Sequence, residues 1–210
     1  MPEFVDRFPL FPLGLVLLPN ETVPLHIFEE RYKTMIGECL ADGTEFGVIW
    51  LSGDGLREIG CAASIPRVLD RADDGRIDIL AEGTRPFRLL RRVEDLAYPA
   101  GDVELLDDGG SETPGSEAGA QARERYADLV DRATDSRPEP GDLEELDAYG
   151  MAATVDLSLG AKQELLELRD EQVRLERIAQ LLEDALRRID YAERAGDLAR
   201  SNGRARPGRP

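Results

Sequence analysis

The sequence predicts an α+β protein in which a small, antiparallel, barrel-like sheet precedes a bundle of helices. Three observations predict this order. Short apolar stretches separated by turn residues fill the first 107 residues, and apolar residues recur every three or four positions near the end of the chain. A segment rich in Gly, Ser, Pro and acidic residues separates the two parts.

The first two strands are predicted from β-forming residues interrupted by proline. Residues 8–18 read FPLFPLGLVLL, and residues 22–28 read TVPLHIF. Because proline lacks a backbone N–H, it is excluded from a helix interior and fits an edge strand or a kinked strand. Both segments are therefore expected to be extended.

A helix is inserted at Glu29, where the apolar period changes to three and four residues. Its apolar face comprises Tyr32, Met35, Ile36, Cys39 and Leu40. We expect the helix to end at Asp42-Gly43, because glycine adopts the left-handed conformation at little cost.

Further strands follow this helix. Residues 45–51 (EFGVIWL) are apolar on both faces, which indicates a strand covered on both sides. Asp73-Asp74-Gly75 is a hairpin signal between strands expected at 58–69 and 76–80. With two more strands expected at 87–93 and 102–106, roughly six short, locally connected strands favour a barrel.

The whole pattern divides the chain into four segments. They are a β-barrel subdomain (1–107), a flexible acidic Gly/Ser linker (108–120), a helical subdomain (121–195) and a disordered Arg-rich tail (196–210). Helices are expected at 123–133, 143–155, 159–168 and from 171 to about 193, the last with a continuous apolar stripe.

The chain is strongly acidic. Its 43 acidic and 26 basic residues give a formal net charge of −17, and without the tail 42 acidic and 22 basic residues leave −20. Such a surface repels phosphate groups, so we expect no nucleic-acid partner and no membrane partner. No stretch reaches the roughly 18 apolar residues of a membrane span. Cys39 and Cys61 fit reduced, buried thiols, and we expect a cytoplasmic protein.

Residue patterns that would indicate catalysis, a metal or a cofactor are missing. His26 is the only histidine, and two distant cysteines cannot complete a zinc site. A phosphate-binding loop requires glycines before its Lys-Thr pair, and none lies among the nine residues before Lys33-Thr34. We expect Lys162 to be solvent-exposed, and we expect no catalytic residue, no cofactor, no metal and no enzyme activity.

Two residues allow more than one interpretation. His26 alternates with Pro24 and Phe28 and could act as a ligand or a switch, because imidazole titrates near neutral pH. A partly buried histidine bonded to a backbone carbonyl is the more common case. Trp50 could line a binding groove, although packing in the core is again more common.

Three segments resemble the N-terminal domain of the Lon protease. Residues 8–36 share its proline-broken strand and helix start, with matches at Pro19, Pro24, Leu25, Phe28, Arg31 and Tyr32. Residues 65–89 (IPRVLDRADDGRIDILAEGTRPFRL) resemble its hairpin. Residues 157–182 (LSLGAKQELLELRDEQVRLERIAQLL) resemble the helix pair that ends that domain.

The resemblance implies a PUA-like β-barrel, a helical bundle and a non-enzymatic protein-binding module. Only binding carries over, since the 210 residues contain neither the ATPase nor the peptidase of the full protease. The implied partner is an unfolded or extended protein segment, or a protease or chaperone. We expect an apolar groove between barrel and helices, with candidate contacts at Pro24, His26, Phe28, Arg31, Tyr32 and Trp50. The alternative is a small-molecule-binding PUA-like domain with an aromatic pocket, and the oligomeric state stays open.

Overall fold

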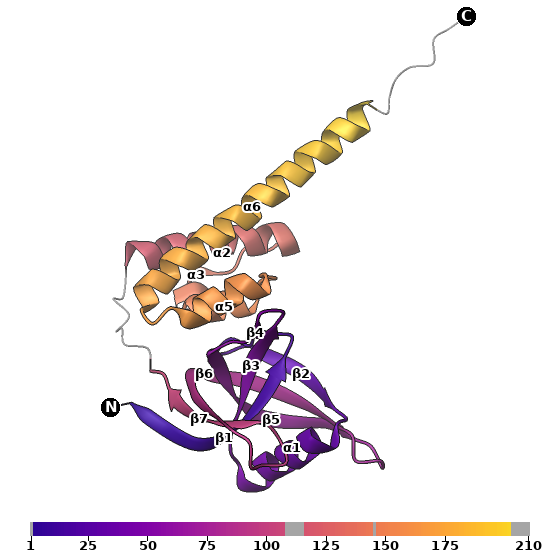
Figure 1. Ribbon diagram of the computed structural model, residues 1–210. Helices are drawn as coiled ribbons and strands as arrows, with labels where there is room; N and C mark the ends of the chain where they lie inside the picture. The colour runs from indigo at the N-terminus through magenta and orange to yellow at the C-terminus, as the bar shows by residue number, and fades with distance from the viewer. Residues whose placement is uncertain (1, 108–115, 145, 203–210) are drawn as a thin grey trace, which may run out of the picture.

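The computed structural model describes residues 2–107, 116–144 and 146–202, and it confirms the predicted α+β order (Figure 1). Within these residues, seven strands and one inserted helix come first: β1 (Glu3–Leu13), β2 (Thr22–Ile27), α1 (Glu30–Asp42), β3 (Phe46–Ser52), β4 (Gly55–Leu56), β5 (Ile59–Arg71), β6 (Ile77–Val93) and β7 (Ala100–Leu105). The helices that follow are α2 (Glu117–Thr134), α3 (Pro140–Glu144), α4 (Ala148–Ala153), α5 (Leu159–Glu167) and α6 (Glu171–Asn202).

The sheet closes into a barrel because β1 changes its partner along its length. Its first part, from Glu3 to Pro9, pairs with β7 in antiparallel fashion, and its last part, from Leu10 to Leu13, pairs with β3 in parallel. A bulge shifts the pairing register between Val5 and Phe8, and Arg7 within this bulge adopts a φ of 57°. The predicted antiparallel barrel is confirmed, with one parallel pairing that completes the ring.

Strand β6 is longer than the sequence pattern indicated. The strands expected at 76–80 and 87–93 are one strand, which pairs first with β2 and then with β7. At Gly83, in the middle of β6, the backbone of Leu18 lies so close that an added Cβ would stand 2.1 Å from the Leu18 carbonyl oxygen. Glycine at this position is what lets the segment before β2 lie against β6.

Two groups of buried residues hold the molecule together. The smaller one fills the barrel with Phe8, Leu10, Ile49, Ala62, Phe87, Val103 and Leu105. The larger one runs from Phe11 and Tyr32, beneath α1, into the helices at Tyr149 and Leu165. The prediction that the strand at 45–51 is covered on both faces is confirmed, because Phe46 belongs to the larger group and Ile49 to the smaller one. Burying each large aliphatic side chain contributes about 1.5–3 kcal/mol.

The helices differ from the expected limits in three places. Helix α2 begins at Glu117, inside the segment predicted as linker, because the Ser116 hydroxyl caps it by accepting the Gly119 N–H at 3.1 Å. The helix expected at 143–155 is two helices, α3 and α4, since Asp147 caps a new one. Helix α6 continues to Asn202, into the predicted tail. Residues 108–115 and 203–210 of the predicted linker and tail lie outside the described residues, and the division into subdomains stays a prediction.

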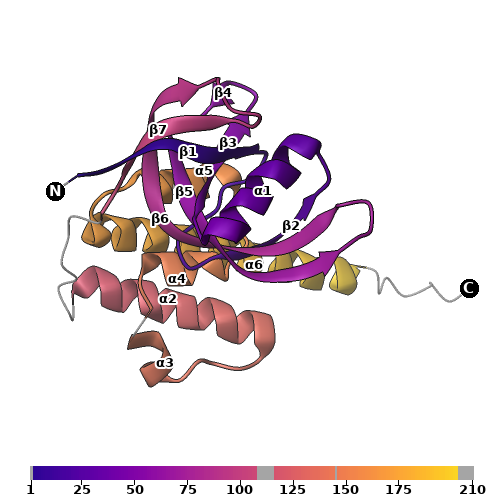
Figure 2. The ribbon, with the colours of Figure 1, turned by 90° about the horizontal axis from the view of Figure 1, so that it is seen from below.

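Helix α5 faces the barrel, and α6 projects well beyond the bundle (Figures 1 and 2). The expectation that Lys162 is solvent-exposed is wrong. Its Nζ lies 2.5 Å from Glu21 Oε1, and the two side chains are only 14% and 15% exposed. Beside it, Gln163 Nε2 donates to the Ile59 carbonyl oxygen at 3.1 Å. These contacts and a core that continues from the barrel into the helices lie in the region where we expected a groove.

Candidate functional site

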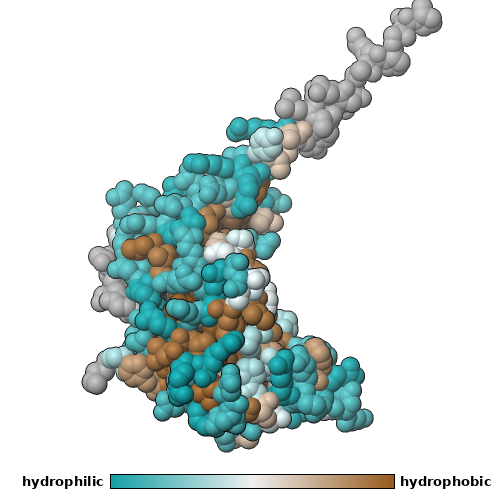
Figure 3. All heavy atoms as spheres, in the orientation of Figure 1, coloured by the Kyte–Doolittle hydropathy of each residue, from teal (hydrophilic) through white to brown (hydrophobic). Residues whose placement is uncertain are grey.

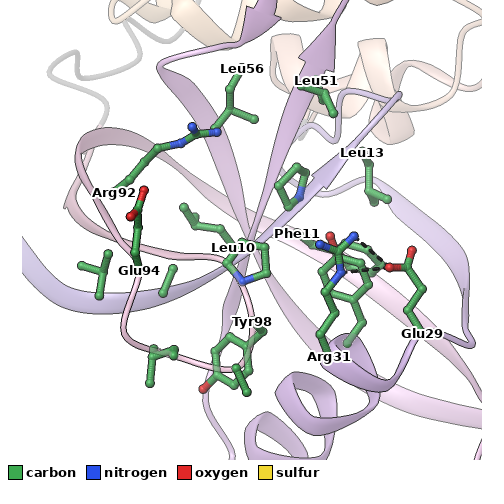
Figure 4. A pocket seen from close by; sticks show the side chains of 17 residues that line it. Leu10, Phe11, Leu13, Glu29, Arg31, Leu51, Leu56, Arg92, Glu94 and Tyr98 are labelled. Atoms are coloured by element: carbon green, nitrogen blue, oxygen red, sulfur yellow. Dashed lines mark hydrogen bonds and ion pairs between the residues drawn. The ribbon is translucent and has the colours of Figure 1, made fainter.

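The wall of the barrel contains an open cavity of about 530 Å³ (Figure 4). Four segments position its lining: the end of β1, the start of α1, the β3–β4 hairpin and the β6–β7 connection. The side chains that line it are Leu10, Phe11, Pro12, Leu13, Glu29, Arg31, Tyr32, Leu51, Leu56, Arg92, Val93, Glu94, Leu96, Ala97, Tyr98, Pro99 and Ala100. A cavity of this volume is within the range that holds ligands or a few side chains of a partner.

The floor of the cavity is aromatic and aliphatic. The rings of Phe11 and Tyr32 lie 4.2 Å apart between centroids, and the guanidinium of Arg31 lies 4.6 Å above the Tyr32 ring. Tyr32 is buried, whereas Leu51 at the rim is 50% exposed. Apolar residues gather on this face of the barrel below the helices (Figure 3). An exposed leucine beside an aromatic floor is a surface that gains free energy when a partner covers it.

The β6–β7 connection forms one wall and is fastened to the barrel. The Tyr98 hydroxyl donates to Glu38 Oε2 at 2.5 Å, and the Leu10 N–H donates to the Pro99 carbonyl oxygen at 2.8 Å. Burial, and then the hydrogen bond to the Glu38 carboxylate, raise the pKa of Tyr98 to about 12. The phenol is therefore neutral at physiological pH and keeps donating to Glu38.

Charged groups stand on both sides of the floor (Figure 4). On one side Arg31 and Glu29 form an ion pair at 2.8 Å. On the other side are Arg92 and Glu94, for which the described residues supply no ion-pair partner. An apolar floor between charged rims suits an amphipathic segment better than a wholly apolar one.

A second hollow, of about 580 Å³, adjoins the cavity and shares Arg92, Val93 and Glu94 with it. Its other lining residues are Asp6, Arg7, Arg91, Asp95 and Asp102. Asp102 accepts the Arg7 backbone N–H at 3.1 Å and pairs with Arg91 at 2.5 Å. These two contacts, in that order, lower the pKa of Asp102, so it is ionised at neutral pH.

The structure divides five of the six candidate contact residues between two surfaces. Arg31 and Tyr32 line the cavity. Pro24 and His26 lie on the exposed face of β2, and Phe28, which is 59% exposed, follows that strand. They form a separate surface, because alternate residues of a strand point to the same side.

The structure shows the surroundings of His26 and Trp50, the two residues that allowed more than one interpretation. The expectation of a partly buried His26 bonded to a carbonyl is wrong, because its side chain is 54% exposed and its Nδ1 meets Asp78 Oδ1. The ring also stacks on Phe28 at 5.8 Å. Trp50 packs against the larger core, with the Arg57 guanidinium 5.1 Å from its ring, and does not line the cavity.

Several cavity residues were missed by the sequence analysis. Leu51 belongs to the strand expected at 45–51, and residues 94–99 (EDLAYP) fall between the strands expected at 87–93 and 102–106. The available signal was Tyr98 followed by Pro99 within a charged loop. The hydrogen bond from Tyr98 to Glu38 of α1, 60 residues away, depends on the closed barrel.

The described residues contain no group of three or more His, Cys, Asp or Glu arranged to hold a metal ion. No helix among them combines the length and the apolar character of a membrane span. Cys39 and Cys61 are free and buried, and burial raises the pKa of both thiols. Two further hollows, of about 680 and 710 Å³, lie beside α6 and share Asp156 and Arg188. None of the six candidate contact residues lines either of them.

Solved structures similar to this chain share the arrangement of barrel and helices. The crystal structure of a Lon N-terminal domain protein from Xanthomonas campestris has a TM-score of 0.65 and 30% sequence identity, covering 85% of this chain and 98% of that one. The N-terminal domain of Mycobacterium avium complex Lon protease has a TM-score of 0.64 at 20% identity, covering 85% and 99%, and supports the fold alone.

Sequence relatives are much longer proteins. Lon protease of Paraburkholderia phytofirmans is 27% identical over 158 residues, which are 70% of this chain and 19% of that protein. Lon protease 2 of Syntrophobacter fumaroxidans is 22% identical over 215 residues, covering 93% of this chain and 27% of that protein. The chain therefore spans 19% and 27% of the length of these two relatives.

A protein-family model covers the barrel, the cavity and most of the helices. Residues 7–184 match the model described as the ATP-dependent protease La (LON) substrate-binding domain. The match confirms the resemblance inferred from the three sequence segments. This chain belongs to the family of Lon substrate-binding domains.

Proposed function

We propose that this chain is a non-enzymatic recognition module that binds extended or unfolded segments of protein substrates in the barrel cavity. The observation that carries the proposal is the open cavity of about 530 Å³, with its aromatic floor and its exposed Leu51 at the rim. Membership of a substrate-binding family supports the same role. A segment seated there would place apolar side chains on Phe11 and Tyr32 and keep its backbone near the charged rims.

This proposal changes the candidate contact surface. Arg31 and Tyr32 remain, and Leu51, Leu56 and Tyr98 join them because they line the same cavity. Tyr32 is unsuitable as a test residue, since it is buried against Phe11 and its removal would disturb the fold. The exposed leucine at the rim is the better one.

The test measures binding of a fluorescently labelled, permanently unfolded protein by anisotropy, with Leu51→Ser as the principal variant. Leu69→Ser, at a leucine 44% exposed on β5, is the matched control with a similar loss of exposed apolar surface, and Phe28→Ser, at a phenylalanine 59% exposed, tests the β2 surface. We expect a Kd in the roughly micromolar range for the unaltered chain. Leu51→Ser should weaken binding about fivefold or more, because about 1 kcal/mol of apolar contact is lost.

Three results would count against this proposal. Equal affinities of Leu51→Ser and Leu69→Ser would remove it as the binding site. A loss confined to Phe28→Ser would move the site to β2. Saturable binding of RNA in a parallel titration would contradict the expectation, based on the net charge of −17, that the partner is a protein and not a nucleic acid.

The small-molecule alternative involves other residues than expected, because neither His26 nor Trp50 lines the cavity, whose aromatic side chains are Phe11, Tyr32 and Tyr98. A tightly bound small molecule retained in native mass spectrometry would support it. We also propose a cytoplasmic location, which the free, buried thiols of Cys39 and Cys61 support.

A further inference from the structure

We propose that the segments bound in the barrel cavity carry lysine or arginine next to their apolar residues, and that segments with acidic flanks are disfavoured. This inference rests on the proposed function, since it takes the cavity as the binding site. It names the class of substrate segment from the charges that the cavity and its adjoining hollow present.

Most guanidinium groups around the cavity are already paired with a carboxylate of the same chain. Arg7 pairs with Asp95 at 2.7 Å, and Arg31 pairs with Glu29 at 2.8 Å. Arg91 also pairs, with Asp102. An acidic side chain of a substrate would have to compete with these intramolecular carboxylates, so the paired arginines offer it little.

The charges left over are mainly negative. Asp6 and Glu94 have no basic partner among the described residues, and Arg92 has no acidic one. All three line the hollow of about 580 Å³ that shares Arg92, Val93 and Glu94 with the cavity. A side chain that follows the seated apolar residue into this hollow therefore meets two unpaired carboxylates and one guanidinium.

The charge of the whole molecule acts in the same direction. A net charge of −17 attracts cationic segments and repels anionic ones during approach, over a distance of about 8 Å at physiological ionic strength. Electrostatic complementarity of this kind mainly sets partner choice and association rate, whereas the apolar floor supplies affinity. The two contributions can be separated experimentally.

The experiment uses three labelled peptides with one shared apolar, aromatic core and flanks of lysine, serine or glutamate. Binding to the full chain is measured by anisotropy at low and at high salt. At low salt we expect the lysine-flanked peptide to bind about tenfold more tightly than the glutamate-flanked one, with the serine-flanked peptide between them. At about 0.5 M salt the ratio should fall to about twofold.

Paired variants locate the source of this preference. Asp6→Asn/Glu94→Gln neutralises the two unpaired carboxylates of the hollow, and Asp70→Asn/Asp73→Asn removes the same charge at exposed positions of the β5–β6 hairpin. The first variant should reduce the tenfold preference to about threefold, and the second should leave it nearly unchanged. Arg92→Gln should increase the preference for lysine, because it removes the unpaired cation.

The outcomes distinguish this inference from the proposed function. Equal binding of all three peptides at low salt would overturn the charge preference and leave the cavity as an apolar site. Equal effects of the two double variants would overturn the role of the hollow. A lysine-flanked peptide with a serine core that binds as tightly as the apolar one would overturn both proposals, as would failure of every peptide to bind.

Discussion

The ion pair between Lys162 and Glu21 is expected to stabilise the contact between α5 and the barrel. Lys162→Met keeps the aliphatic length of the side chain and removes its charge. Glu21 then keeps a carboxylate that is 15% exposed, with the Leu18 N–H at 3.0 Å as its remaining contact. Removing one partner of a fully buried pair costs about 3–5 kcal/mol, and an exposed pair is worth about 0–1 kcal/mol. For this largely buried pair we expect a loss of about 2–3 kcal/mol.

The assay is urea denaturation followed by circular dichroism, in a double-mutant cycle with Glu21→Gln. A coupling energy of about 2 kcal/mol between the two positions is expected, and Lys162→Met alone should lower Tm by about 5–10 °C. Lys33→Met is the matched control. Lys33 pairs with Glu30 at 2.8 Å and donates to the Asp74 carbonyl oxygen at 3.2 Å, but the glutamate is 89% exposed and Asp74 lies in an exposed turn, so the loss should stay below about 1 kcal/mol. A coupling below about 0.5 kcal/mol would refute the assignment of this pair as a stabilising contact.

Two further predictions concern the barrel. Gly83→Ala should destabilise the fold by about 3 kcal/mol or more, because its Cβ would stand 2.1 Å from the Leu18 carbonyl oxygen. Gly37→Ala, in an open position of α1, should instead stabilise the fold by about 0.5–1 kcal/mol. Equal urea midpoints of the two variants would contradict both expectations. The raised pKa of Tyr98 means that the folded state retains a proton which the unfolded state loses, so its stabilising contribution is present below pH 10 and is lost towards pH 12. The stability difference between the unaltered chain and Tyr98→Phe should therefore shrink over this range in alkaline urea titrations, and a constant difference would argue against the Glu38 hydrogen bond.

The sequence predicted the order of elements well, because most of them depend on local patterns. The period change at Glu29 and the stop at Gly43 locate α1 to within a residue, and Gly43 does adopt a φ of 65°. Asp73-Asp74-Gly75 joins β5 and β6, with Gly75 at a φ of 83°. Periodicity and turn residues are properties of neighbouring positions, so they can be read without tertiary information.

Features that depend on distant partners could not be read in this way. Nothing within residues 3–13 indicates that β1 pairs first with β7 and then with β3. Lys162 resembles any exposed helical lysine until Glu21, 141 positions away, is brought beside it. The same limit applies to the site, where Arg31 and Tyr32 were found through the resemblance and Tyr98 was not, because its position depends on barrel closure.

The double pairing of β1 has a consequence for the way the chain folds during synthesis. Strand β1 precedes the other strands of the ring in the sequence and also closes the ring, and its first part has no strand partner until Ala100–Leu105 have been made. The contacts of α2, α4 and α5 with α6 join segments that are closer in the sequence, and they can form soon after these helices emerge. The nascent chain must therefore keep an unpaired, partly apolar strand from aggregating while about a hundred residues are added. Until β7 has been made, the first part of β1 is therefore itself an exposed, partly apolar stretch of protein chain.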